Sequence, residues 1–228
     1  MVALTKKNAL LLWDNFVNPF HLSQSNITPS SAPSMDMPSC QLILYACPTG
    51  SLAYQIEDYL QDSQKRWGIN KAHQYMPHCT LTGFFHDQEE AIALYLQTLE
   101  SLMLEALKTP AKIQITDLLF KTDWHGLMLE SPWLQSLTQA FAEKANSPTR
   151  MEALRLKTWL HVSLAYGFDP EHSQGLKQLA LERVDPNATV GWEVRFYERL
   201  PEAGQSQTPK AGGQTLLNEW RCHGRWEI

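Results

Sequence analysis

Two histidines in this chain stand in the same short pattern, and the repetition limits how the chain can fold. The runs are His78-Cys79-Thr80-Leu81 and, about eighty positions later, His161-Val162-Ser163-Leu164. Both lie in apolar stretches that predict β-strands, where side chains at positions i and i+2 point to the same face. Each histidine therefore shares a face with a hydroxyl residue, while the intervening residues point into a core. Two imidazoles, each with a hydroxyl beside it, can hold a phosphate between them.

The same pattern also arises by chance, so its context decides its meaning. A third match, His21-Leu22-Ser23, lies in a Ser/Pro-rich stretch without strand character, and we interpret it as fortuitous. The other two matches have apolar flanks and a leucine in fourth place. Each is followed by Gly-Phe and then by acidic residues at the start of a predicted helix. This shared context favours a functional pair. The alternative is an α+β protein whose histidines are satisfied core residues without a site.

Composition narrows the class of partner. The chain has 228 residues and a formal charge of −5, which argues against DNA or another long nucleic acid, whereas a small anion needs only a local pocket. The four cysteines have no C-x-x-C spacing and are typical of reduced thiols in the cytoplasm. No apolar run is long enough to span a bilayer. We therefore expect a cytoplasmic monomer with no membrane partner.

The order of predicted elements indicates an α+β fold. The predicted strands cover 41–47, 78–85, 112–120, 124–130, 159–166, 190–200 and 216–228, and helices follow the first, second, fourth and fifth of them. Ser131-Pro132 opens one helix, and Asp87 with Glu90 forms a capping-box pattern before another. Because each half contributes a motif strand followed by a helix, we expect two pseudo-symmetric lobes whose antiparallel sheets face a central cleft, with helices outside. These lobes form a single domain over 40–228, and residues 1–39 form a partly irregular extension.

The motif residues suit metal-free chemistry on a phosphate ester. An imidazole titrates near pH ~6.5, so one ring can take a proton from a nucleophile while the other protonates the leaving oxygen. Thr80 and Ser163 can donate hydrogen bonds to the non-bridging oxygens. The histidines that flank the first motif, His73 and His86, match no zinc spacing, so we expect surface or capping roles for them and no metal. A strained cyclic phosphodiester suits this arrangement, because its leaving group stays tethered and needs only a proton.

These paired His-x-Thr/Ser runs resemble the two-histidine (2H) phosphoesterase superfamily. It includes bacterial RNA 2′,3′-cyclic phosphodiesterases, also called 2′-5′ RNA ligases, nucleotide cyclic phosphodiesterases and U6 RNA-processing phosphodiesterases. The resemblance implies that His78 and His161 are the catalytic histidines and that Thr80 and Ser163 hold the phosphate. It also implies two lobes that face each other across a cleft, and no cofactor. Residue-level similarity is strong only at the two motifs.

Within the superfamily, the second motif is most similar to the nucleotide cyclic phosphodiesterases. Their plant form has a substrate-contacting tyrosine at the place of Tyr166, where the RNA ligase-like form has a basic residue. Strict alternation puts Tyr166 on the face opposite His161, so it reaches the site only if the strand ends or twists at Gly167. Trp124 begins a strand that can border the cleft, where its ring either stacks on a base or packs in the core.

The resemblance implies hydrolysis of a cyclic phosphate on a nucleotide, of the 2′,3′-cyclic or ADP-ribose 1″,2″-cyclic type. Two alternatives stay open. One is an RNA 2′,3′-cyclic phosphodiesterase, a 2′-5′ RNA ligase-like enzyme or an RNA end-trimming enzyme, whose partner is an RNA 3′ end. The other is a module of the same fold that binds a nucleotide without turning it over.

Overall fold

The computed structural model describes residues 39–200 and 219–228. The predicted extension, up to residue 38, and residues 201–218, which include the start of the last predicted strand, therefore lie outside the described residues. The described strands are β1 (Ser39–Thr49), β2 (Cys79–Thr80), β3 (Phe85–Gln88), β4 (Gln114–Phe120), β5 (Trp124–Glu130), β6 (His161–Tyr166), β7 (Gly191–Arg199) and β8 (Trp220–Glu227). The α-helices are α1 (Ser51–Trp67), α2 (Ile92–Ala106), α3 (Pro132–Lys144) and α4 (Ser173–Arg183), and the 3₁₀ turns are η1 (Lys71–Gln74), η2 (Glu89–Ala91) and η3 (Pro170–His172).

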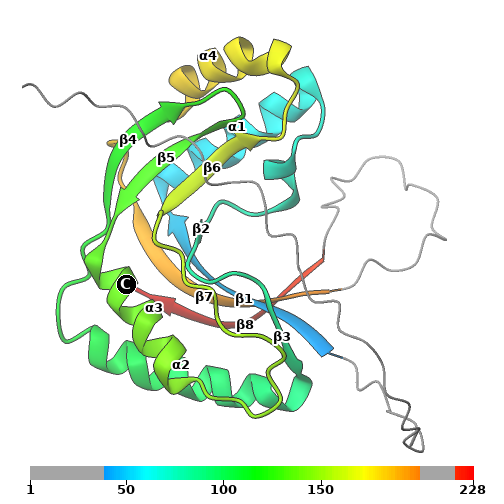
Figure 1. Ribbon diagram of the computed structural model, residues 1–228. Coiled ribbons are helices and arrows are strands. Elements are labelled where there is room, and N and C mark those ends of the chain that lie inside the picture. Colours follow the sequence, from blue (N-terminus) through cyan, green and yellow to red (C-terminus); the bar gives the residue numbers. More distant parts are fainter. Residues whose placement is uncertain (1–38, 201–218) are drawn as a thin grey trace, which may run out of the picture. The chain divides into compact units, whose positions relative to one another are not determined.

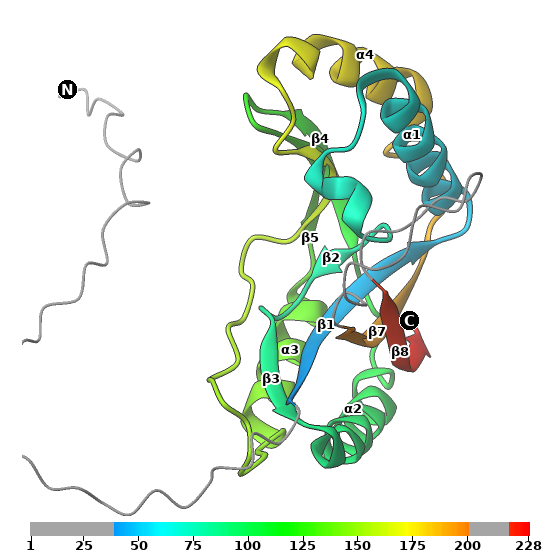
Figure 2. The same ribbon diagram turned by 90° about the vertical axis from the view of Figure 1, so that its right-hand side faces the viewer.

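The described strands form one antiparallel sheet, so the predicted α+β class is confirmed. Its order is β4-β5-β6-β2-β1-β7-β8, and β3 pairs with the outer part of β1 (Figure 1). The sequence led us to expect a separate sheet in each lobe. The structure instead joins the two halves, because β2 pairs with β1 on one side and with β6 on the other. Figure 2 shows this short strand beside β1.

The helices contact each other in two pairs that reflect the two halves. Helix α1 packs with α4, and α2 packs with α3, at opposite ends of the view in Figure 1. All four contribute to one apolar core, together with alternate residues of the strands such as Leu44, Val162 and Phe196. The other face of the sheet carries a smaller cluster of Ile43, Tyr45, Cys47 and Tyr197. The helices therefore cover one face, and side chains of the opposite strand parity lie on the other.

Strand β1 is central, which explains its sequence. Its run from Leu42 to Cys47 is continuously apolar and buried, because the main core covers one side and the smaller cluster covers the other. A strand covered on both faces loses the apolar–polar alternation of a half-exposed strand. The predicted strand at 41–47 is confirmed and extends by two residues at each end.

The first motif strand is shorter than predicted. Pairing covers only Cys79–Thr80 and then Phe85–Gln88, because the chain leaves the ladder at Thr82. The backbone N–H of Leu44 donates to Thr82 Oγ1 at 3.1 Å, so a side-chain hydroxyl replaces a strand carbonyl there. Thr82 is also bridged to Leu156 of the other half. The pattern of apolar residues does not reveal that a side-chain hydroxyl takes the place of a backbone acceptor here.

Two helix-start predictions have different outcomes. Ser131 caps α3 as expected: its hydroxyl accepts from the backbone N–H of Leu134 at 3.1 Å, with Pro132 following; such caps contribute about 1 kcal/mol. The predicted capping box at Asp87 is wrong. Asp87 is fully buried at the end of β3, where its carboxylate accepts hydrogen bonds from Tyr95 and Thr149. Burial alone would raise the pKa of this carboxyl, but the hydrogen bonds reverse the effect and lower it.

Within residues 39–200 and 219–228, no helix has both the length and the apolar character that crossing a bilayer requires.

Candidate active site

The two motif runs meet side by side, in opposite directions. Strands β2 and β6 pair antiparallel with Cys79 opposite Val162. Extended by one residue each way, this register sets Thr80 beside His161 and His78 beside Ser163. Cys79 and Val162 are fully buried in the main core, so the four motif side chains share the opposite face, away from the helices. All four are partly exposed. The Cys79–Val162 pair thus lies at the centre of a local two-fold arrangement.

Both imidazoles are oriented by the same backbone contact. His78 Nδ1 is 2.8 Å from the carbonyl oxygen of Met76, and His161 Nδ1 is 3.1 Å from that of Trp159. Because a carbonyl can only accept, Nδ1 carries the hydrogen in each ring and Nε2 is left with a lone pair. Within the part of the chain that the structure describes, neither Nε2 has a hydrogen-bond partner. Each ring thus presents a nitrogen that can accept a proton and, once protonated, return it.

The hydroxyl of the second motif is fixed from behind by an indole. Trp124 Nε1 donates to Ser163 Oγ at 2.9 Å, which leaves the hydrogen of the serine free to be donated elsewhere. Gly126 lies opposite Ser163 in the sheet and makes this possible. A Cβ at position 126 would lie 2.5 Å from Trp124 Cζ2 and 2.3 Å from the carbonyl oxygen of Val162. Sequence reasoning missed this glycine, because its role depends on a cross-strand contact.

A bulge in β6 changes the expected orientation of Tyr166. The register with β5 shifts so that Gly126 opposes Ser163 while His125 opposes Ala165, which leaves Leu164 as the extra residue. Leu164 and Ala165 are both buried in the main core, so two consecutive side chains point to the same face. Beyond them, each side chain of β6 points to the face opposite the one that strict alternation predicts. Tyr166 therefore returns to the face of His161. Its environment agrees: burial raises the pKa of Tyr166, and the nearby Tyr75 hydroxyl raises it further.

The His78 ring lies among phenol rings. Its centroid is 4.0 Å from that of Tyr45, the residue that pairs with Thr80, and 5.3 Å from that of Tyr75. Loss of solvation lowers the pKa of His78 to about 4, and the positive charge of a protonated His161 contributes to the shift. The two imidazoles are thus close enough to interact electrostatically. Sequence reasoning did not single out Tyr75, whose position follows from η1 packing on β6.

The His161 ring lies among indole rings and lysines. Its centroid is 4.0 Å from that of Trp159 and 5.2 Å from that of Trp124, which meets it edge-on. Loss of solvation lowers the pKa of His161, and the charges of Lys157 and Lys121 lower it further. A bound anion would oppose these shifts in both rings, since negative charge favours the imidazolium form. The arrangement can therefore hold an oxyanion and exchange protons on either side of it.

The remaining histidines near the first motif have other partners. His73 belongs to a capping box with Asn70 at the start of η1, so the predicted capping role is confirmed. His86 Nδ1 is 2.7 Å from Glu152 Oε1, and its Nε2 is 3.2 Å from the Gln41 amide nitrogen. No group of three His, Cys, Asp or Glu side chains among the described residues is arranged to hold a metal ion.

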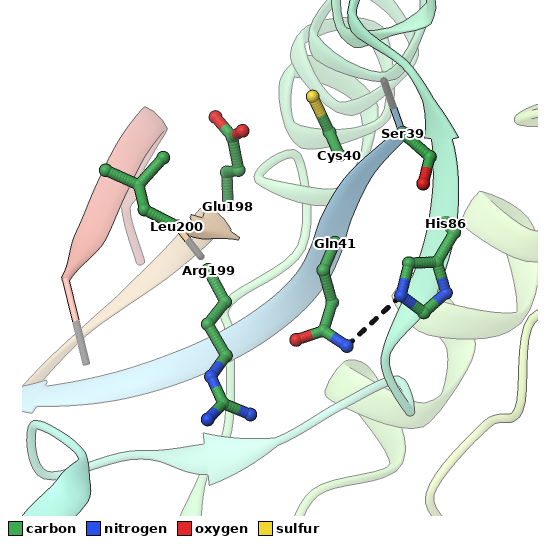
Figure 3. A pocket seen from close by; sticks show the side chains of 7 residues that line it. All are labelled: Ser39, Cys40, Gln41, His86, Glu198, Arg199 and Leu200. Carbon is green, nitrogen blue, oxygen red and sulfur yellow. Dashed lines mark hydrogen bonds between the residues drawn. The ribbon is translucent and has the colours of Figure 1, made fainter. Parts of the chain in front are cut away.

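A cavity of about 370 Å³ lies at the outer end of β1. Figure 3 shows the side chains that line it. Gln41 and His86 line it together with Arg199, Glu198, Leu200, Cys40 and Ser39. Glu198 is held by Arg221 and His223, at 3.2 and 2.9 Å. Gln41 is four residues from Tyr45, which corresponds to about 13 Å along a strand. The cavity is therefore displaced along β1 from Tyr45, although Gln41 has the strand parity of Ile43 and Tyr45 and belongs to the same face of the sheet.

No protein-family model matches the chain. Curated proteins with similar sequence include an ecdysteroid-phosphate phosphatase of Bombyx mori, 28% identical over 194 residues that cover 83% of this chain and 28% of that protein. Ubiquitin-associated and SH3 domain-containing protein B of Mus musculus is 31% identical over 165 residues, which cover 70% of this chain and 25% of that protein. Ubiquitin-associated and SH3 domain-containing protein A of Homo sapiens is 32% identical over 221 residues, which cover 78% of this chain and 33% of that protein.

The chain thus spans about a quarter to a third of the length of these relatives. Most of each relative's length lies outside the match, and an activity that belongs to a whole relative can reside there. The comparisons therefore do not assign the chain to the two-histidine superfamily, and they do not transfer the phosphatase activity in the name of the Bombyx mori protein. What they establish is that most of this chain is similar to one segment of several longer proteins. Two of these, the Bombyx mori protein and an insect relative from Drosophila melanogaster, are named ecdysteroid-phosphate phosphatase.

Proposed function

We propose that this chain hydrolyses a phosphate ester, and that the ester is a cyclic phosphodiester on a nucleotide, of the 2′,3′-cyclic or ADP-ribose 1″,2″-cyclic type. The supporting observation is the antiparallel register of Cys79 with Val162, which gathers two imidazoles and two hydroxyls on one face. The names of the insect relatives support the coarser part of the proposal, phosphoester hydrolysis. The cyclic substrate is argued from the chemistry of the motif residues.

In the proposed reaction, one imidazole takes a proton from water as the water oxygen attacks phosphorus. The ring P–O bond breaks, and the other imidazole gives its proton to the departing ribose oxygen. Thr80 and Ser163 donate hydrogen bonds to the non-bridging oxygens, where negative charge accumulates. The surroundings of both histidines lower their pKa values, and a bound phosphate anion raises the pKa of the ring that must carry the proton. Solvent exchange then restores the starting protonation states.

The decisive assay follows the hydrolysis of 2′,3′-cyclic AMP with EDTA present. We expect turnover to persist, and His78→Ala and His161→Ala each to lower kcat/KM by about 10²–10⁴-fold. Their melting temperatures should stay close to that of the parent, because both rings are partly exposed. His172→Ala, at the end of η3 before α4, is the matched control and should keep full activity. Activity that disappears with EDTA, or that survives in one motif variant, would contradict the paired mechanism.

Two further substrates and one binding measurement separate the alternatives. Turnover of a steroid phosphate or another phosphomonoester, without turnover of the cyclic nucleotide, would retain phosphoester hydrolysis and reject the cyclic substrate. A much higher kcat/KM for an oligonucleotide with a 2′,3′-cyclic end than for the mononucleotide would favour an RNA-end enzyme. Tight calorimetric binding of a nucleotide without any product would favour the non-catalytic module.

A further inference from the structure

An exposed tryptophan, Trp159, lies two residues before the start of β6 and has the strand parity of His161. Trp159 has 44% of its surface exposed, whereas Trp124, the ring that the sequence suggested for base stacking, has only 8%. Trp124 is therefore occupied in holding Ser163. Trp159 is the indole beside the motif histidines that retains a large exposed surface. Single exposed apolar side chains are common on proteins, so exposure alone assigns no role.

What distinguishes Trp159 is how firmly it is held beside His161. Its carbonyl oxygen accepts from His161 Nδ1 at 3.1 Å, and its ring centroid is 4.0 Å from the imidazole centroid. The buried Trp124 supports it from another side, with centroids 5.0 Å apart. In the proposed function His161 contacts the phosphate. The Trp159 ring, whose centroid is 4.0 Å from that of His161, therefore lies close to the expected position of the nucleotide base. The ribose that separates phosphate from base spans a comparable distance.

Positive charge accompanies this ring. Lys121 is exposed, and its ammonium lies 4.6 Å from the centre of the Trp159 ring and 5.7 Å from that of Trp124. Lys121 and Lys157 both act on the pKa of His161, which places their charges near the site. Because the lysine side chain is long and flexible, Lys121 can leave the ring when another planar group takes its place. The displaced ammonium then stays within reach of phosphate oxygens.

We propose that Trp159 stacks on the nucleobase of the substrate, and that Lys121 moves from the indole to the anionic oxygens of the same ligand. This inference rests on the proposed function and deepens it: the preferred substrate is a nucleoside cyclic phosphate rather than a base-free sugar phosphate. Stacking on an indole tolerates any base, so the site discriminates weakly among bases. The specificity lies in the presence of a planar base.

The test compares adenosine 2′,3′-cyclic phosphate with methyl riboside 2′,3′-cyclic phosphate, which lacks the base. We expect the parent to prefer the nucleotide in kcat/KM, and Trp159→Ala to reduce that preference about tenfold, chiefly through KM. Trp159→Phe keeps an aromatic face and should retain most of the preference. Trp159→Leu keeps an apolar cover over His161 without that face, and should lose the preference as Trp159→Ala does. Tyr54→Ala, an exposed aromatic position on the helix-covered side, is the control.

The possible failures are distinct. If Trp159 only shields His161, Trp159→Ala changes the pH profile and lowers kcat/KM equally for both substrates, so the preference is unchanged and the inference is overturned. If Trp159→Leu behaves like the parent, cover rather than stacking is the role, and the inference is again overturned. If the parent hydrolyses neither substrate, the proposed function fails, and this inference fails with it.

Discussion

The two motif histidines share their backbone geometry and differ in nearly everything around them. Each is held by a carbonyl two residues earlier in the chain, yet His78 lies among the phenol rings of Tyr45 and Tyr75, and His161 lies among indoles. Desolvation depresses the pKa in both rings, but lysine charges add to the shift only at His161. The duplicated strand motif thus fixes where two imidazoles stand, while the neighbouring elements set their proton affinity and the contacts available to a ligand.

Gly126→Ala is expected to have the largest effect among the variants that test the difference between the surroundings of His78 and those of His161. The new Cβ would overlap the Val162 carbonyl oxygen and the Trp124 ring, so the His161 side should be disrupted while the His78 side is spared. We expect a loss of about 3 kcal/mol in unfolding free energy, measured by urea denaturation. Activity should fall as well, because Ser163 loses its fixed partner.

Gly68→Ala is the matched control for that substitution. Gly68 ends α1 with a φ of 78°, and nothing lies within 4 Å of a Cβ built there, so its cost is conformational rather than steric. A loss of about 1 kcal/mol without any change in kcat/KM is expected. If both alanine variants lose the same stability and the same activity, the close approach at Gly126 does not position the site.

The pH dependence of stability should distinguish the two histidines. The pKa of His78 is lowered from 6.5 to about 4 in the folded protein, so the unfolded chain binds a proton first as the pH falls. The stability linked to neutral His78 is complete above pH 6.5 and is lost between pH 6.5 and 4, a change on the order of 3 kcal/mol. Thermal melts from pH 7 to 4 should show that His78→Ala flattens this dependence more than His161→Ala. A larger flattening by His161→Ala would reverse our account of the two environments.

The smallest expected effect concerns the hydroxyls. Ser163 is held by an indole N–H, whereas Thr80 has no hydrogen-bond partner for its hydroxyl within the residues the structure describes. Trp124→Phe removes that N–H and should lower kcat/KM about two- to tenfold, the range for one neutral hydrogen bond. Trp133→Phe removes an equivalent indole bond, to the Ala106 carbonyl oxygen, on the helix side, and should leave activity unchanged. Equal effects from both variants would show that the Trp124 bond has no special place in the site.

Alternation and turn chemistry were sufficient to predict much of the fold. They predict the buried strand at 41–47, the strands at 112–120 and 124–130, and the cap at Ser131, because each depends on neighbours in sequence. The juxtaposition of the two motif runs also follows from the pattern of apolar and polar residues, once the two strands pair. The roles of the motif residues stay predictions until activity is measured.

The features that the sequence could not show depend on contacts across the sheet. The bulge at Leu164 reverses the face of Tyr166, and no residue in the strand marks it. The exit of Thr82 from the ladder depends on a hydroxyl that accepts from Leu44, which is remote in sequence. The exposure of Trp159 and the burial of Trp124 likewise follow from packing between strands. Such features require the register, and hydrophobic periodicity does not specify it.

The shortness of β2 has a mechanical consequence. The halves of the sheet meet along a seam where a single residue pair, Cys79 and Val162, is in register. A slight rotation about that seam moves His78 and His161 relative to each other, yet leaves each ring fixed to its own carbonyl. Helix α1 contacts both β1 and β6 behind the seam and restrains this rotation. The separation of the two imidazoles is therefore set by this single pair and by the packing of α1, while the direction of each Nε2 is set by its own carbonyl.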